Sequence, residues 1–274
     1  MTIQNSDLSL TAAAIPADIQ LPASFQHIRN ATAKLNYAGN IILIDPMFSG
    51  KGVLGSIAGE KTSPLVDLPV SADEILEAVD LVLITHTHRD HLDQAAIDKL
   101  DKNIEIFNQP ADTEFMLTNG FVNATTIQNT IIWHGITITR TTAEHGTGRI
   151  LEKMGQVSGF VLQAKELPTL YFIGDAIWTQ DIYLNIAKYK PDYIIVNSGG
   201  AAMPSFEATP ILMDELQTLA LVQESGNATV IAVHMEAIDH CRTTRTILRE
   251  TAARWNISDS KLLIPADGET LVLN

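Results

Sequence analysis

The segment that decides the fold is Thr85-His86-Thr87-His88-Arg89-Asp90-His91, which places four metal-ligand side chains within six consecutive residues. It follows the apolar run Leu81-Val82-Leu83-Ile84, which is typical of a buried strand, so the cluster begins where that strand ends. Two of its histidines can converge on one cation when the backbone turns, and the aspartate and last histidine can reach a second cation nearby. Imidazoles combined with a carboxylate favour Zn, Mn, Fe or Ni over Ca or Mg. The segment therefore predicts a transition-metal site.

Three more candidate ligands share this context of a strand-like run followed by a loop. His145 and His234 each follow a run of β-branched and apolar residues, and Asp175 follows a short apolar run broken by Gly174. Each of them alone is equally well explained as a capping aspartate or a hydrogen-bonded histidine. Together with the segment above they supply five histidines and two aspartates. This set is enough for two sites of three protein ligands each, joined by a shared carboxylate and a water.

The spread of the candidate ligands bears on the domain organisation. The length of 274 residues allows one large domain or two small ones. The ligands extend from His86 to His234 without a linker or charge run between them, so we expect one domain over residues 25–274. Residues 1–24 are expected to form an irregular arm, which lacks the basic flank of a signal peptide. Apolar residues make up 46% of the chain, enough for a sizeable core.

Charge and cysteine content narrow the partners and the compartment. The formal net charge of −14 argues against a nucleic-acid partner, which requires a basic surface. The single cysteine, Cys241, excludes an internal disulfide and fits a reducing cytoplasm. We therefore expect a cytoplasmic protein with a small-molecule substrate and with no membrane partner, and we leave open whether it forms a homo-oligomer.

Strands and helices are expected to interleave along both halves of the chain. A capping box of Ser71 and Glu74 marks the start of the first helix. Strands are expected near residues 41–45, 80–84, 104–107, 131–141, 157–164, 169–173, 192–197, 229–233 and 270–273. Helices are expected near residues 72–79, 92–101, 111–119, 180–189, 209–224 and 241–255. The pattern by itself predicts a layered α/β domain.

The ligand pattern resembles the metallo-β-lactamase superfamily, whose signature is His-x-His-x-Asp-His followed by a distant His, Asp and His. The likeness extends to Asn40–Phe48, Val157–Asp175 and Val196–Gly200, and it covers the chain from Phe25 onward. Within the superfamily it is most similar to the metal-dependent hydrolases that include the L-ascorbate-6-phosphate lactonases. The resemblance implies an α/β fold, an αββα sandwich in which two mixed β-sheets pack face to face with helices outside.

The resemblance also implies which ligands bind each of two metal ions. It assigns His86, His88 and His145 to a first divalent metal ion, Asp90, His91 and His234 to a second, and Asp175 to both as a bridge. Zn is the first choice for both ions, with Mn, Fe or Ni as alternatives. A water held between two cations loses its proton near neutral pH, and the resulting hydroxide attacks a small ester, lactone or phosphoester. The Asp90 carboxylate would also accept a hydrogen bond that orients this hydroxide.

Departures from subfamily patterns limit the alternatives. Metallo-β-lactamases usually carry a cysteine where Asp175 stands, which argues against antibiotic hydrolysis. Diiron oxidoreductases of the superfamily typically carry Glu where His88 stands. Two alternatives to hydrolysis stay open: an iron-dependent oxygenase or redox protein on the same scaffold, and a non-catalytic member that binds its ligand through the metals.

Several residues near the predicted centre allow two interpretations. His240 is either a general acid for the leaving group or a polar residue at the start of a helix. Glu236 either holds a ligand imidazole or faces solvent. Arg89 either contacts substrate or faces solvent. Asn197, Gly199 and Gly200 are expected in a tight loop beside the metals, where glycine allows close backbone approach.

Overall fold

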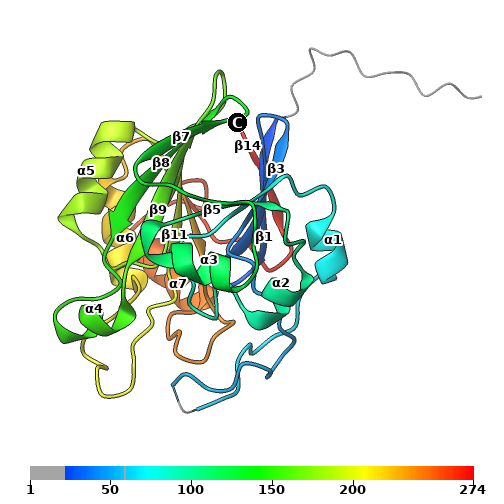
Figure 1. Ribbon diagram of the computed structural model, residues 1–274. Helices are drawn as coiled ribbons and strands as arrows, with labels where there is room; N and C mark the ends of the chain where they lie inside the picture. The colour runs from blue at the N-terminus through cyan, green and yellow to red at the C-terminus, as the bar shows by residue number, and fades with distance from the viewer. Residues whose placement is uncertain (1–21, 59) are drawn as a thin grey trace, which may run out of the picture.

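The computed structural model describes residues 22–58 and 60–274. Within these residues, two mixed sheets of seven strands each pack face to face, and helices lie on both outer sides (Figure 1). The expected αββα sandwich is thereby confirmed. Most of the predicted arm, residues 1–24, lies outside the described residues, and its last two positions begin the first strand at Ala23. None of the helices in the described part of the chain is long and apolar enough to span a bilayer.

The first sheet is antiparallel on one side and parallel on the other. Its β2–β3 turn has φ of 52° at Ala38 and 75° at Gly39, the left-handed pair that tight hairpins require. Each strand is antiparallel to its neighbour from β14 through β1 and β2 to β3, and parallel to its neighbour from β3 through β4 and β5 to β6. The strands in spatial order are β14 (Thr270–Leu273), β1 (Ala23–Arg29), β2 (Thr32–Tyr37), β3 (Asn40–Ile44), β4 (Leu81–Leu83), β5 (Glu105–Asn108) and β6 (Ala124–Thr126).

The second sheet repeats this arrangement. Strands β7, β8, β9 and β10 are antiparallel, and β10, β11, β12 and β13 are parallel. The single strand expected over residues 131–141 was wrong, because His134 and Gly135, with φ of 46° and 81°, form a hairpin turn within it. The strands in spatial order are β13 (Leu262–Leu263), β12 (Thr229–Val233), β11 (Tyr193–Asn197), β10 (Leu170–Phe172), β9 (Val157–Gln163), β8 (Ile136–Ala143) and β7 (Thr130–Trp133).

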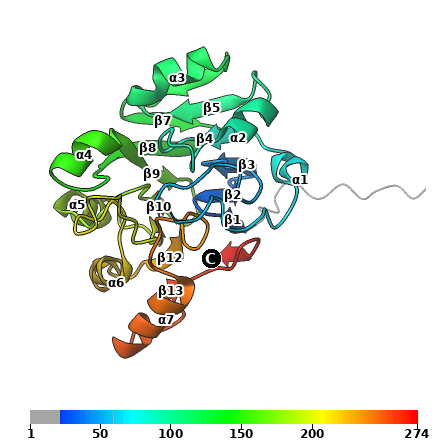
Figure 2. The ribbon, with the colours of Figure 1, turned by 90° about the horizontal axis from the view of Figure 1, so that it is seen from below.

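Helices cover the two outer faces, as the view from below separates them (Figure 2). The first sheet carries α1 (Ala72–Leu76), α2 (Gln94–Lys99), η1 (Pro110–Asp112) and α3 (Thr113–Thr118). The second sheet carries α5 (Gln180–Tyr189), α6 (Glu215–Glu224) and α7 (Arg245–Arg254), while α4 (Arg149–Met154) packs against the loops beyond it. Helix α5 has the predicted bounds. The predicted start of helix α1 at Ser71 is confirmed, since the Ser71 hydroxyl accepts a hydrogen bond from the backbone N of Glu74.

The alternation along β4 explains why the strand is apolar throughout. Leu81 and Leu83 point into the core between the sheets, and Val82 points the other way, into the core beneath the helices of the first sheet. All three are fully buried. A strand covered on both faces needs apolar residues at every position. Burying each such side chain stabilises the fold by about 2 kcal/mol, so β4 is firmly fixed just before the motif begins.

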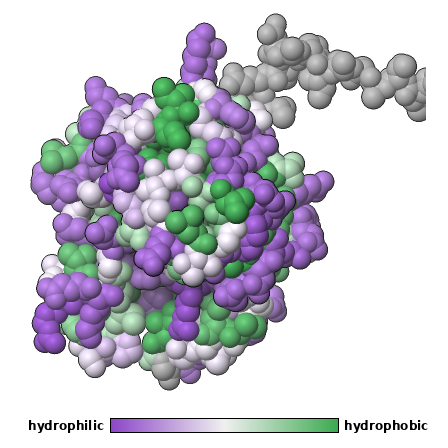
Figure 3. Space-filling view, viewed as in Figure 1, coloured by the Kyte–Doolittle hydropathy of each residue, from purple (hydrophilic) through white to green (hydrophobic). Residues whose placement is uncertain are grey.

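The outer surface is mainly polar on the face shown in Figure 3, where hydrophobic residues form small, separate groups among hydrophilic ones. This agrees with the strongly acidic composition of the chain. Two helices begin later than predicted: α6 at Glu215, capped by Asp214, and α7 at Arg245, capped by Thr244. The residues ahead of these caps are loops, and they border the site described next.

Candidate metal centre

The candidate ligands leave the carboxyl ends of strands that run in one direction. Strands β10, β11 and β12 are parallel, and β8 runs with them because both β8 and β10 are antiparallel to β9. His145, Asp175 and His234 follow β8, β10 and β12, and His86 follows β4 in the facing sheet. Since the carboxyl ends of parallel strands meet at one edge, these loops converge. The structure brings all seven predicted ligands together there.

The first group of ligand atoms comes from His86, His88 and His145, which all lie within 4.8 Å of one another. The Nε2 atom of His86 is 3.0 Å from the Nδ1 atom of His88. His86 and His145 are buried, whereas His88 is partly exposed and lines a pocket. Three imidazoles at this spacing form the kind of nitrogen triad that binds a transition metal.

The second group comes from Asp90, His91 and His234 and is buried at every position. The Nε2 atom of His234 lies 3.2 Å from Nε2 of His91 and 3.3 Å from Oδ2 of Asp90. His234 has φ of 62°, so a left-handed residue directly after β12 turns the imidazole toward the other two. Two imidazoles and a carboxylate again suit a transition metal.

Asp175 lies between the two groups and divides its oxygens between them. Its Oδ2 atom is 3.4 Å from Nε2 of His145 and 3.8 Å from Nε2 of His86. Its Oδ1 atom is 3.2 Å from Nε2 of His91 and 3.8 Å from Nε2 of His234. One carboxylate oxygen therefore faces each group, which is the arrangement expected of a bridging ligand.

Hydrogen bonds behind the imidazoles test whether these residues suit metal ions. Asp45 accepts hydrogen bonds from Nδ1 of His91 at 2.8 Å and from Oγ1 of Thr85 at 2.6 Å. The Thr85 hydroxyl donates its proton to Asp45. Its oxygen is therefore left to accept a hydrogen bond from Nδ1 of His86, 3.1 Å away. Nδ1 of His145 donates to the carbonyl oxygen of Ile211 at 2.7 Å.

These bonds occupy Nδ1 of His86, His91 and His145, so that Nε2 of each ring faces the other ligands and is the atom that would bind a metal. Nδ1 of His234 is likewise held, 3.6 Å from the thiol of Cys241, and His88 alone presents Nδ1. A carboxylate or carbonyl behind a metal-binding imidazole fixes its tautomer and orientation. The residues present therefore fit two metal ions.

Charge at the centre is balanced between carboxylates and imidazoles. Burial lowers the pKa of His145 to about 4, so this imidazole is neutral near pH 7, the form that binds a metal. Burial also lowers the pKa of His91, but the carboxylates of Asp175 and Asp45 outweigh it and raise the value to about 10. Burial raises the pKa of Asp175, yet the charges of His91 and His234 hold it well below its usual range. Metal binding at the second group is therefore coupled to proton release.

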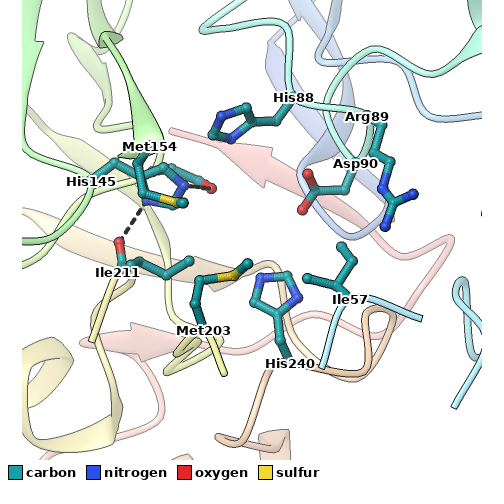
Figure 4. Close-up of a pocket in the computed structure, with 10 residues that line it drawn as sticks. Ile57, His88, Arg89, Asp90, His145, Met154, Met203, Ile211 and His240 are labelled. Atoms are coloured by element: carbon teal, nitrogen blue, oxygen red, sulfur yellow. Dashed lines mark hydrogen bonds and ion pairs between the residues drawn. The ribbon is translucent and has the colours of Figure 1, made fainter. Parts of the chain in front are cut away.

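A pocket with a volume of about 220 Å³ opens onto this centre (Figure 4). Figure 4 shows the Asp90 carboxylate and the imidazoles of His88 and His240 around the pocket, with the thioethers of Met154 and Met203 on its other walls. The lining residues are Ile57, His88, Arg89, Asp90, His145, Met154, Asp175, Met203, Ile211 and His240.

His240 belongs to the pocket and not to the following helix, which begins at Arg245. The side chain is buried, with 5% exposed, and its Nδ1 atom has no hydrogen-bond partner among the described residues. Burial lowers the pKa of His240, so the ring is neutral near pH 7. The interpretation of His240 as the first residue of a helix was wrong.

Contacts bear on two other open interpretations. Glu236 forms an ion pair with Arg245 at 2.6 Å and accepts a hydrogen bond from the backbone N of Arg245 at 3.0 Å, so its carboxylate is engaged by Arg245 and not by a ligand imidazole. Arg89 donates to the carbonyl oxygen of Leu54 at 2.9 Å, so part of its guanidinium is engaged at the pocket rim. A Cβ atom at Gly199 would lie 2.4 Å from the carbonyl oxygen of His234, which confirms the close approach expected there.

Sequence reasoning missed Asp45 and Thr85, which support the ligands, and it expected Asn197 beside the metals without foreseeing its contact. Asp45 and Thr85 hold two imidazoles, and Asn197 donates from Nδ2 to Oδ1 of Asp175 at 2.6 Å. Each stands at or just after a strand end, as the ligands do. This position was the available signal, but it does not indicate which partner a side chain contacts.

Comparison with known proteins agrees with this geometry. The chain matches the family model described as the beta-lactamase superfamily domain over residues 40–235, which include the whole ligand set. It therefore belongs to the metallo-β-lactamase superfamily. It is also 35% identical to the UPF0173 protein YddR of Bacillus subtilis strain 168 over 249 residues, covering 89% of this chain and 97% of that relative. The chain thus belongs to the UPF0173 family, in which other relatives, such as one from Xanthobacter autotrophicus that is 25% identical over 181 residues, are named UPF0173 metal-dependent hydrolases.

Two crystal structures are similar over nearly the whole chain. One is of a protein described as a possible metal-dependent hydrolase from Veillonella parvula DSM 2008, with a TM-score of 0.88 and 35% identity, covering 92% of this chain and 100% of that one. The other is of an isothiocyanate hydrolase from Delia radicum gut bacteria, with a TM-score of 0.84 and 36% identity, covering 92% and 99%.

Proposed function

We propose that the chain is a dinuclear metal hydrolase that acts on a small, uncharged substrate with an electrophilic carbon. The observation that carries this proposal is the position of Asp175, whose two oxygens face two separate ligand groups at the base of a pocket. His86, His88 and His145 would hold one ion, and Asp90, His91 and His234 the other. When bound, two such ions activate water as a nucleophile and polarise the bond that it attacks.

Asp90 is the residue placed to orient the attacking water. It lines the pocket, and its carboxylate points into the open space in Figure 4. Burial raises the pKa of Asp90, but the hydrogen bond with His234 and the charge of His91 outweigh burial and keep the pKa well below its usual range. An ionised carboxylate at this point accepts a proton or a hydrogen bond from the nucleophile.

His240 is placed to contact the substrate from the opposite side of the pocket. Because its pKa is lowered, the neutral ring acts as a hydrogen-bond partner and not as a ready source of a proton. Its unpartnered, buried Nδ1 atom gains a partner when a polar atom of the substrate binds. We therefore propose that His240 positions the substrate by a hydrogen bond to one of its polar atoms, in place of the general-acid interpretation.

The pocket walls favour uncharged substrates over phosphoesters. Its non-ligand lining is largely apolar, from Ile57, Met154, Met203 and Ile211, and its only cationic side chain, Arg89, already donates to a backbone carbonyl. Apart from the two metal ions, a phosphoester would find no free cationic partner on these walls, whereas the apolar side chains suit a neutral substrate. Esters and lactones are uncharged and have an electrophilic carbon. The sequence resemblance to lactonases supports lactones as substrates.

The similarity to an isothiocyanate hydrolase adds a further member of the same chemical class. An isothiocyanate, R–N=C=S, is small and uncharged and has an electrophilic central carbon. Addition of one water to that carbon, followed by cleavage of the C–N bond, gives the amine R–NH₂ and carbonyl sulfide. An apolar R group suits the methionine and isoleucine walls.

Metal reconstitution followed by a substrate panel tests the proposal. Protein purified without chelator and reloaded with Zn or Mn should contain two metal equivalents per chain. It should hydrolyse esters, lactones or isothiocyanates with short apolar groups, and it should lose this activity when the metals are removed. A stoichiometry of one under metal-replete conditions, or a preference for charged phosphodiesters over every neutral substrate, would overturn the proposal.

A further inference from the structure

The carboxylate of Asp239 is tied to a loop that the proposed mechanism does not use. It accepts hydrogen bonds from the backbone N of Ile57 at 2.9 Å and of Ala58 at 3.1 Å, and a weaker one from Lys61 at 3.4 Å. The hydroxyls of Ser56 and Ser63 donate to it as well. A single side chain thus holds residues 56–58, 61 and 63 in one arrangement.

The connection is reciprocal, and it ends in the substrate pocket. The backbone N of Asp239 donates to Oγ of Ser63 at 3.1 Å, so the loop in turn fixes the chain next to His240. Ile57 and His240 both line the pocket and lie side by side in Figure 4. Asp239 therefore joins the two segments that carry these two pocket residues.

Packing around this junction couples it to the rest of the pocket wall. Ile57 and Leu54 pack against a small buried cluster formed by Met47, Ala237 and Ile238. The carbonyl oxygen of Leu54 accepts the hydrogen bond from Arg89 described above. The wall is thus held by apolar contacts on one side and by polar contacts on the other, and Asp239 adds its bonds to the backbone pairing of Leu54 with Ser63.

We propose that Asp239 is a positioning residue for the substrate, which sets the distance between Ile57 and His240 and thereby the width of the pocket beside Asp90. This inference rests on the proposed function, because it takes this pocket to be the substrate site. The role is distinct from catalysis, since Asp239 does not line the pocket and belongs to neither ligand group.

Substitution of Asp239→Asn tests the proposal with two independent readouts. An amide nitrogen cannot accept a hydrogen bond, so the loop loses part of its hold while the side chain keeps its shape. We expect KM for a substrate with an apolar tail to rise about tenfold, the effect of about 1.4 kcal/mol, with kcat changed less than KM. Digestion with endoproteinase Lys-C should cleave faster after the exposed Lys61, whose backbone N bonds to Asp239.

Two further variants keep the test decisive. Ser63→Ala removes one hydrogen bond in each direction and should act in the same sense with a smaller effect, which covers a failure of the first variant to fold. Asp259→Asn is the matched control. This exposed carboxylate forms an ion pair with Arg249 among the described residues, and it lies outside the pocket lining. It should change neither readout.

The outcomes separate this inference from the proposed function. Faster cleavage together with a raised KM and unchanged metal content supports the role of Asp239. An unchanged KM, an unchanged cleavage rate, or a loss of metal in the Asp239→Asn protein overturns it. Failure of the wild-type protein to hydrolyse any neutral substrate would instead overturn the proposed function, and the cleavage rates would still decide whether Asp239 holds the wall.

Discussion

Substitution of Asp45→Asn should weaken the second metal site without removing any ligand. Asp45 is buried, and its carboxylate accepts three hydrogen bonds: from Nδ1 of His91 at 2.8 Å, from Oγ1 of Thr85 at 2.6 Å and from the backbone N of Thr85 at 2.8 Å. An asparagine amide has one accepting atom, so no orientation of it satisfies all three donors. At least one donor is left unpaired in a buried place.

The size of the effect follows from these contacts. Removing the partner behind a metal-binding imidazole typically weakens metal binding about 10- to 100-fold, which corresponds to about 1.4–2.8 kcal/mol. We expect the loss mainly at the ion held by His91, because that imidazole contacts Asp45 directly. His86 depends on Asp45 only through Thr85, so the first ion should be affected less. The unpaired donor should also lower the free energy of unfolding by about 1–3 kcal/mol.

Competition with a chromophoric chelator measures both metal affinities in one titration. The matched control is Asp80→Asn, an exposed aspartate that accepts a hydrogen bond from Ile41 at the far end of β3. The control should bind both ions as the wild type does. Equal affinities in the Asp45→Asn and wild-type proteins, or a loss confined to the first ion, would refute this account of the centre.

Three further outcomes are expected. Asp90→Ala should lower kcat by at least about a hundredfold with the fold retained; activity within a few-fold of wild type would exclude its role with the nucleophile. His240→Ala should lower kcat/KM about tenfold on good and poor leaving groups alike, with metal retained, whereas a loss confined to poor leaving groups would restore the general acid. Burial raises the pKa of Tyr37 to about 12, above its unfolded value, so its contribution to stability is present below pH 10 and lost as the pH rises toward 12. Urea unfolding at pH 9 and 11 should show that Tyr37→Phe reduces this loss; an unchanged pH dependence would contradict it.

The ligand set could be predicted from the sequence because each ligand has a recognisable local context. A histidine or aspartate directly after an apolar run needs no knowledge of distant contacts, and His86, Asp175 and His234 were found in this way. The supporting residues are different. Thr85 and Asn197 have their roles through side chains that meet only in the folded chain, so nothing near them in sequence indicates the partner.

Strands β1 and β2, which contain buried polar residues, were not predicted because the partners of those residues are also distant in sequence. β1 and β2 lack the apolar run that marked β4, because β1 buries His27 and Arg29 completely. These side chains are satisfied by backbone carbonyls, such as those of Met47 and Ser49 for Arg29, which no local pattern reveals. The late starts of α6 and α7 follow from their caps: Asp214 and Thr244 bond to the first turn, and the residues before them serve the pocket and its surroundings instead.

The division of the ligands between the two sheets links metal supply to the lifetime of the folded chain. The motif follows a strand of one sheet, and His145, Asp175 and His234 follow strands of the other, so neither sheet alone contains a complete site. Ions that bind only the assembled pair of sheets stabilise it by mass action, by about 2.7 kcal/mol for each ion at a free concentration one hundred times its Kd. If the proposed ions bind, we expect a shortage of metal to lower the stability of the folded chain as well as its activity.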